Sequence, residues 1–223
     1  MMEWIIILVV VIAALIILFS LYFNRDPVRT IPPGKSIVSP ADGVIIDIID
    51  MLDLNRKKLE SKIPNSRNKV SRKPKIRIAK GIAGKIRTTA SEVSDHCYII
   101  VIFMNLHNVH VQRAPLGGKV TSIRHTNGKF LAANSLKATA ENEKIEMLIK
   151  NRGIGTIKVI QIAGFLTRRI ESFVKKGENL LKGQRIGRIK LGSQVVLIMP
   201  DLPLNVKKGD KVTAGETVIA KYE

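Results

Sequence analysis

The chain has 223 residues, with 37 Lys and Arg against 18 Asp and Glu, and a formal net charge of +19. This length suits one domain with a substantial core, and 45% apolar residues exclude a disordered polycation. The single cysteine, Cys97, excludes an internal disulfide and a thiolate zinc cluster. The positive charge leaves nucleic acid or an anionic membrane surface as the expected partner.

An uncharged apolar run extends from Trp4 to Phe23. Twenty residues at a rise of about 1.5 Å span about 30 Å, the thickness of a bilayer core. Trp4 and Tyr22 lie near its two ends, where interfacial aromatic residues are expected. The alternative is a cleaved signal peptide, which would need a basic start and a small-residue cleavage site that this run lacks. We therefore predict a single-pass transmembrane anchor over residues 1–23.

Positive charge follows the anchor in two places. Arg25, Arg29 and Lys35 come first, so the positive-inside rule places a domain of residues 24–223 on the cytoplasmic side of the cell membrane. Residues 55–87 then carry thirteen Lys and Arg against one Glu, and no aromatic residue. Because base stacking needs aromatic rings, we expect no nucleic-acid partner. This basic insertion is either a solvated loop or hairpin, or a patch that lies on anionic lipid.

Two similar segments near the C-terminus, 174–186 and 206–218, both read V-K-K-G-x5-G-x2-[IV]. Such glycine-punctuated segments, like the Pro and Gly corners at 39–44 and 114–120, are typical of strand–turn–strand structure. We predict a mainly β fold, a sandwich or flattened barrel, whose repeats resemble the lipoyl or biotinyl hammerhead. Nearly continuous apolar runs predict strands that are buried on both faces at 97–104, 154–162 and 194–199.

The chain has four histidines, and two of them, His107 and His110, directly follow an apolar run. Residues spaced by three face opposite ways in a strand, so only a bend would bring both to one site. A metal site would need a third ligand, and the neighbouring sequence offers none, so we predict no metal. We expect His96 and His125 to be structural.

One arrangement of polar residues suits nucleophilic chemistry. Asp42 lies in a Pro-Ala-Asp-Gly corner, and Ser193 follows Gly192 before an apolar run. An Asp that orients a His, which in turn deprotonates a Ser, is the generalised catalytic triad. A Gly-Ser dipeptide by itself is equally consistent with a plain turn.

Six short motifs occur along the chain in a fixed order. They are FNRDPVRTIP (23–32), SPADGV (39–44), VHVQRAP (109–115), ENE (141–143), IAGFLTRRI (162–170) and LGS (191–193). Together they resemble the pyruvoyl-dependent phosphatidylserine decarboxylase family, most closely its short prokaryotic and archaeal forms. Gln112 replaces the usual Asn of the third motif, and Gln194 replaces the Thr or Arg that often follows the last.

The resemblance implies that the chain is a proenzyme that makes its own cofactor. His110, oriented by Asp42, would remove the proton from Ser193, whose hydroxyl oxygen attacks the carbonyl of Gly192. The chain would then break between residues 192 and 193. The small chain, 193–223, would begin with a pyruvoyl group, which is the cofactor, and would stay bound to the large chain.

The resemblance also implies a reaction, the loss of CO₂ from the serine headgroup of phosphatidylserine or of archaetidylserine to leave ethanolamine. His107 is the predicted acid that protonates the product, and Arg168 and Arg169 are candidates to bind the lipid phosphate. The sequence leaves the lipid tails open, and also the oligomeric state, with which a homo-oligomer is compatible. The alternative from another class is a non-enzymatic membrane-anchored adaptor with lipoyl-like β repeats.

Overall fold

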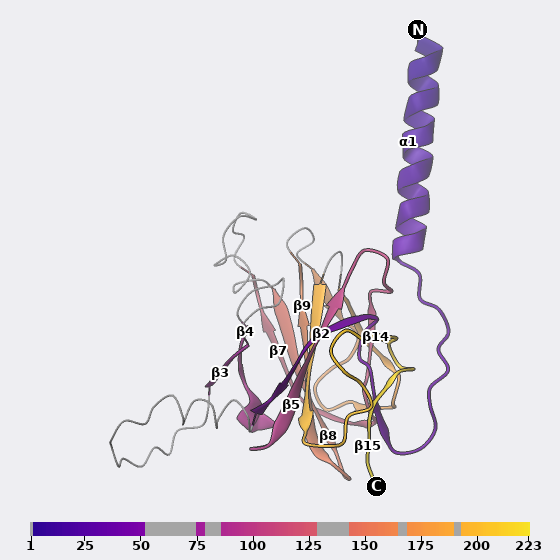
Figure 1. Cartoon of the computed structure of the whole chain (residues 1–223). Coiled ribbons are helices and arrows are strands. Elements are labelled where there is room, and N and C mark those ends of the chain that lie inside the picture. The colour runs from indigo at the N-terminus through magenta and orange to yellow at the C-terminus, as the bar shows by residue number, and fades with distance from the viewer. Residues whose placement is uncertain (1, 52–74, 79–85, 129–142, 165–168, 190–192) are drawn as a thin grey trace.

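The computed structural model describes residues 2–51, 75–78, 86–128, 143–164, 169–189 and 193–223 (Figure 1). Helix α1 (Met2–Phe23) comes first and is followed by a β domain. The helix extends away from that domain, and Phe23 alone among its described residues is buried. An 18-residue window of this 22-residue helix has a mean hydropathy of 3.3, so the helix is long and apolar enough to cross a membrane.

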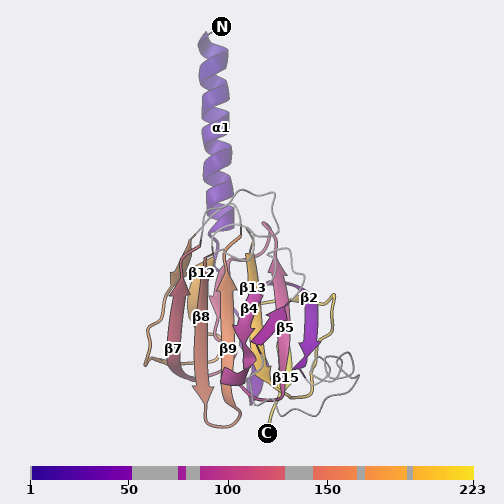
Figure 2. The same cartoon turned by 90° about the vertical axis from the view of Figure 1, so that its left-hand side faces the viewer.

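The main element of the domain is an eight-stranded antiparallel sheet that curls into a half-barrel (Figure 2). Its order is β11 (Asn179–Leu180), β7 (Gly118–Thr126), β8 (Lys144–Asn151), β9 (Gly155–Ile162), β13 (Ser193–Pro200), β5 (Cys97–Met104), β2 (Gly43–Asp50) and β14 (Lys211–Val212).

Three smaller sheets complete the described part of the domain. One contains β10 (Ile170–Ser172), β12 (Arg185–Ile189) and β6 (Val111–Arg113), and another contains β1 (Ser36–Val38) and β15 (Val218–Lys221). The third is the hairpin β3 (Lys75–Ile78) and β4 (Ile86–Thr89), which is followed by the short 3-10 helix η1 (Ala90–Glu92). The hairpin begins within the basic insertion 55–87 and ends just beyond it, at Thr89, and the other residues of the insertion fall outside the described ones.

Strand β13 lies at the centre of the large sheet, and Ser193 to Met199 are all buried. On one face Val195 and Leu197 join the main core, which fills the space between the large sheet and the smaller ones. On the other face Val196 and Ile198 join a second apolar cluster, which Ala90 of η1 helps to cover. The predicted strand buried on both faces is therefore confirmed, and so is the mainly β fold.

The two VKKG segments form matching turns. Gly177 and Gly209 have φ of 94° and 95°, and Gly183 and Gly215 both have φ of 79°. Each segment pairs with one predicted corner, β11 with β7 at Gly118 and β14 with β2 at Gly43. Strands β11 and β14 therefore occupy the two edges of the large sheet. The turns are confirmed, whereas the lipoyl-type interpretation stays a prediction.

We expect Gly183→Ala to destabilise the domain by about 2 kcal/mol. Its φ of 79° already disfavours a side chain by about 1 kcal/mol, and an added Cβ would lie 2.2 Å from Ile31 Cδ1. Gly155 is a matched control, because its φ is 83° but an added Cβ would meet no atom within 4 Å. Denaturant unfolding in detergent should show that Gly155→Ala costs about half as much. Equal losses would mean that Ile31 moves aside freely.

Candidate active site

Ser193 is the first residue of β13, at the end of the sheet that faces α1 (Figure 1). It pairs with Met104, the last residue of β5, and its side chain is only 3% exposed. The Ser193 hydroxyl donates to Met104 Sδ across 3.4 Å, which is a weak hydrogen bond. The candidate nucleophile is therefore buried in a largely apolar setting and is not strongly bound by another group among the described residues.

His110 lies just before β6 at the same end of the domain and is 1% exposed. The chain bends between β5 and β6, where the Asn108 N–H donates to the Asn105 carbonyl across 3.2 Å. The bend places the two histidines in different surroundings, since His110 is buried whereas His107 is exposed. Neither ring nitrogen of His110 has a hydrogen-bond partner among the described residues.

The environment of His110 lowers its pKa to about 4. Burial is the main cause, since it disfavours the charged ring, and the positive charge of Arg25 acts in the same direction. The backbone of Asn108 and the negative charge of Asp42 oppose the shift. At neutral pH the ring is therefore uncharged, which is the form that can accept a proton.

The predicted hydrogen bond between Asp42 and His110 is wrong for this structure. Arg29 Nη2 donates to both Asp42 oxygens, at 3.0 and 2.9 Å, and the Ala214 N–H donates to Oδ1 across 2.8 Å. A guanidinium is a stronger partner for a carboxylate than a neutral imidazole is, so Arg29 occupies the carboxylate that we expected to orient the ring. Asp42 acts on His110 through its charge.

A buried glutamine links the two candidate residues. Gln112 Nε2 donates to the His110 carbonyl across 2.9 Å and also lies 3.6 Å from Met104 Sδ, the same sulfur that Ser193 contacts. Gln161 Nε2 in turn donates to Gln112 Oε1 across 2.9 Å, and Gln161 Oε1 has no partner among the described residues. The residue that replaces Asn in the VHVQRAP motif thus bonds the His110 backbone and the methionine sulfur that Ser193 also contacts.

Residues 24–32, which we call the strap, connect helix α1 to the domain through charged side chains. Asp26 accepts from Arg113 Nη2 at 2.9 Å and from Arg185. Arg29 pairs with Asp42, and Arg25 donates to the His107 carbonyl. The FNRDPVRTIP motif therefore attaches the helix to the active-site end of the sheet, a role that sequence reasoning missed. The sequence signal for this role was charge complementarity, because Asp26 and Arg29 of the strap are opposite in charge to their partners Arg113 and Asp42.

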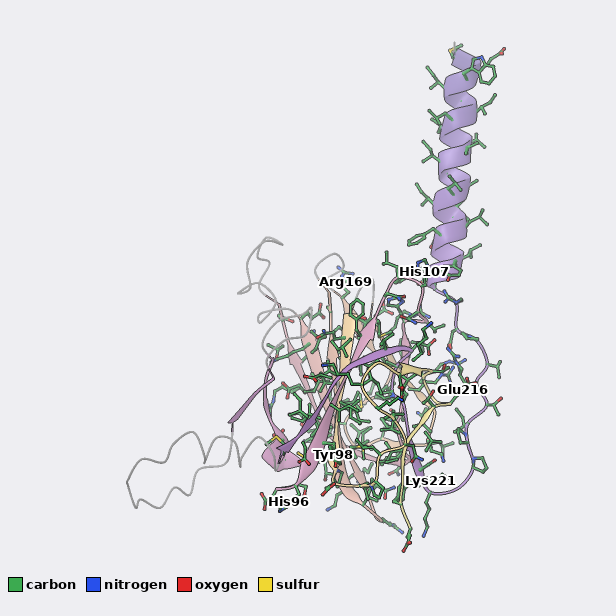
Figure 3. All side chains as sticks on the ribbon, in the orientation of Figure 1. His96, Tyr98, His107, Arg169, Glu216 and Lys221 are labelled. Atoms are coloured by element: carbon green, nitrogen blue, oxygen red, sulfur yellow. The ribbon has the colours of Figure 1, made fainter. Side chains whose placement is uncertain are left out.

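Two other predicted site residues lie at the same end but do not join this cluster. His107 and Arg169 are exposed and lie at the end of the domain near α1 (Figure 3). Gly192 and Arg168 fall outside the described residues. Gln194 is buried, and both of its amide atoms lack a partner among the described residues.

The two histidines expected to be structural differ in position. His96 lies at the opposite end of the domain from α1 (Figure 3), whereas His125 bonds Glu143 across 2.7 Å. Burial raises the pKa of the Cys97 thiol to about 11, so this cysteine is not a nucleophile at neutral pH. Within the described ranges no three His, Cys, Asp or Glu side chains are grouped to hold a metal ion.

Comparison with known proteins identifies the family. The family described as phosphatidylserine decarboxylase matches residues 16–220. A protein of Methanocaldococcus jannaschii, provisionally named archaetidylserine decarboxylase proenzyme, is 37% identical over 92% of this chain and 90% of its own length. The phosphatidylserine decarboxylase proenzyme of Pelodictyon phaeoclathratiforme is 38% identical over 93% of this chain and 81% of its own length. The chain belongs to the phosphatidylserine decarboxylase family.

Proposed function

We propose that this protein is a membrane-anchored proenzyme that converts its own Ser193 into a pyruvoyl group. With that group it would decarboxylate the serine headgroup of phosphatidylserine or archaetidylserine. Membership of the family and the names of the relatives support a serine-phospholipid decarboxylase. The observation that carries the finer proposal is the burial of Ser193 and the unpartnered His110 at one end of the sheet, next to α1.

Self-cleavage would begin when neutral His110 takes the hydroxyl proton of Ser193. The Ser193 Oγ then bonds to the carbonyl carbon of Gly192, and the peptide nitrogen leaves that carbon, so an ester replaces the amide. Loss of the Ser193 α-proton then breaks the Cβ–O bond, which leaves a carboxylate on Gly192 and a dehydroalanine at 193. Addition of water to the dehydroalanine and release of ammonia leave a pyruvoyl group.

The surroundings of Ser193 suit a group of this kind. The position is buried, and the nearby ring nitrogens of His110 and Gln161 Oε1 are polar atoms without partners among the described residues. Such atoms can exchange protons with, or orient, a small polar group. A pyruvoyl group would supply an electron sink for the electrons that decarboxylation releases. We assign protonation of the product to His107 and phosphate binding to Arg169 with Arg168.

The cleaved chain should remain one folded unit. The small chain 193–223 would contain β13, whose neighbours β5 and β9 both belong to the large chain. It would also contain β14 and β15, which pair with β2 and β1. Because these strands share the main core, cleavage between residues 192 and 193 removes one peptide bond and leaves the sheet contacts in place.

We propose that α1 holds the enzyme at its substrate. Except for Phe23, the described side chains of this apolar helix are not covered by the domain, so lipid is their natural environment. The positive charge after the helix favours the cytoplasmic side, and the basic insertion 55–87 would add attraction to anionic lipid. Phospholipids leave the bilayer slowly, so a site next to the end of a transmembrane helix could bind its substrate while the lipid remains in the membrane.

Mass spectrometry of the purified protein tests the proposal. We expect two chains that separate between residues 192 and 193, and a small chain whose N-terminus resists Edman degradation because it carries no amine. Assays on phosphatidylserine and archaetidylserine should release CO₂ from at least one lipid and would identify the preferred tails. An intact chain that is fully active would refute the pyruvoyl mechanism, and an intact inactive chain would refute self-processing.

A further inference from the structure

We propose that Phe23, the last residue of the anchor helix, is a positioning residue of the active site. Its ring covers His110, keeps water from it and fixes its orientation. The anchor then serves the chemistry directly, besides holding the protein at the membrane. This inference rests on the proposed role of His110 as the proton acceptor in self-cleavage.

The contact between the two rings is close. Their centroids lie 4.3 Å apart and their planes are inclined by 34°. Phe23 is 6% exposed, whereas the other described residues of α1 are exposed. Burial of this one side chain against the domain therefore arises from the interaction with His110 and its surroundings.

Further contacts set the position of Phe23 from both sides. Phe19, one helical turn earlier, stacks on Phe23 with ring centroids 6.0 Å apart. Arg25 donates to the Tyr22 carbonyl across 2.8 Å and also to the His107 carbonyl. The end of the helix is thus bonded to the same β5–β6 bend that leads into His110, so the two rings are held together by backbone contacts as well as by packing.

The consequence for His110 is a dry and neutral ring. The charged groups that act on it are Arg25, from the strap, and Asp42, from the corner before β2, and the backbone of Asn108 is also near. Burial, which the charge of Arg25 reinforces, outweighs the opposing effects of Asp42 and of the Asn108 backbone and lowers the pKa of His110 to about 4. A phenyl ring against an imidazole supplies burial without a hydrogen bond, so Phe23 leaves the ring nitrogens of His110 unoccupied.

Truncation of the ring tests this role. Phe23→Ala lets water reach His110, so its pKa should rise from about 4 towards about 6.5. Because only the neutral ring accepts a proton, the acid limb of the self-cleavage rate should move to higher pH in parallel. Lost orientation should also lower the rate at pH 8 by about tenfold. Phe23→Leu, which restores apolar cover, should recover most of both changes.

Leu15→Ala is the matched control, because Leu15 lies on the same helix and is exposed, away from Phe23 and His110. Its pH profile should follow the wild type. A Phe23→Ala protein whose pH profile and rate match the wild type would overturn the proposal. If that variant does not fold, Phe23→Val should shift the acid limb of the self-cleavage rate by an intermediate amount. An unshifted acid limb in Phe23→Val would also overturn the proposal.

A second measurement separates this inference from the proposed function. NMR titration of ¹³C-labelled histidine in detergent reads the pKa of His110 without any reaction, and His110→Asn assigns its signal. A wild type that never cleaves would refute the proposed function, while the titration would still show whether Phe23→Ala raises the pKa of His110. An unchanged pKa in an otherwise cleaving protein would refute the role of Phe23 alone.

Discussion

Ser193→Ala is expected to remain a single chain of 223 residues and to lose decarboxylase activity by at least about a thousandfold. Alanine has no oxygen to attack the carbonyl of Gly192, so neither the ester nor the pyruvoyl group can form. The fold should persist, because the Ser193 hydroxyl makes only a 3.4 Å contact with Met104 Sδ among the described residues. Intact-mass measurement and CO₂ release from serine phospholipid report the two losses separately.

Ser122→Ala supplies the control, since Ser122 lies on β7 of the same sheet and is only partly buried. This variant should be cleaved and active like the wild type. Cleavage between residues 192 and 193 in Ser193→Ala would show that another group starts the reaction. Substantial decarboxylation by that uncleaved variant would show that no pyruvoyl group is needed.

Arg29→Met should lower the free energy of unfolding by about 3 kcal/mol. The side chains of Arg29 and Asp42 are only 11% and 14% exposed, and their closest charged atoms lie 2.9 Å apart. Removal of the guanidinium leaves the Asp42 carboxylate mostly buried without its cation and detaches part of the strap from the domain. Denaturant unfolding in the uncleaved Ser193→Ala background measures the loss without separation of the two chains.

An exposed ion pair gives the comparison for this prediction. Lys208 and Asp47 lie 3.4 Å apart with side chains 69% and 29% exposed, so Lys208→Met should cost less than about 1 kcal/mol. Asp42→Asn should offset part of the Arg29→Met loss when the two changes are combined, because it removes the unpaired charge. Equal costs for Arg29→Met and Lys208→Met would show that the strap contributes little to stability.

Hydrophobic patterning predicted the elements of this fold well. The run at 97–104 is β5, and the runs at 154–162 and 194–199 coincide with β9 and β13 to within a residue at most ends. Strands that are buried on both faces need apolar residues at every position, and that requirement is visible without any structure. The repeated glycines likewise predicted turns, because their positive φ values favour glycine.

The contacts of the site were harder to predict. Ser193 and His110 were recognised by residue type and motif, and both proved to lie buried at one end of the sheet. The partner of Asp42 was assigned wrongly, because chemistry allows an Asp to bind either a His or an Arg. Only the path of the strap brings Arg29 to that carboxylate.

The sequence by itself determined the apolar anchor, the mainly β domain and the family, since these depend on residue type and spacing along the chain. The tertiary structure decided which distant residues meet. Phe23 and His110 are far apart in sequence, yet their rings lie 4.3 Å apart because the strap returns the end of the helix to the sheet. Burial and charge pairing across such distances depend on how the chain closes on itself, which local patterns do not encode. The +19 net charge illustrates this division, because its sign left nucleic acid or an anionic membrane as the partner, whereas only the fold showed that Arg25 bonds the His107 carbonyl and that Arg29 pairs with Asp42.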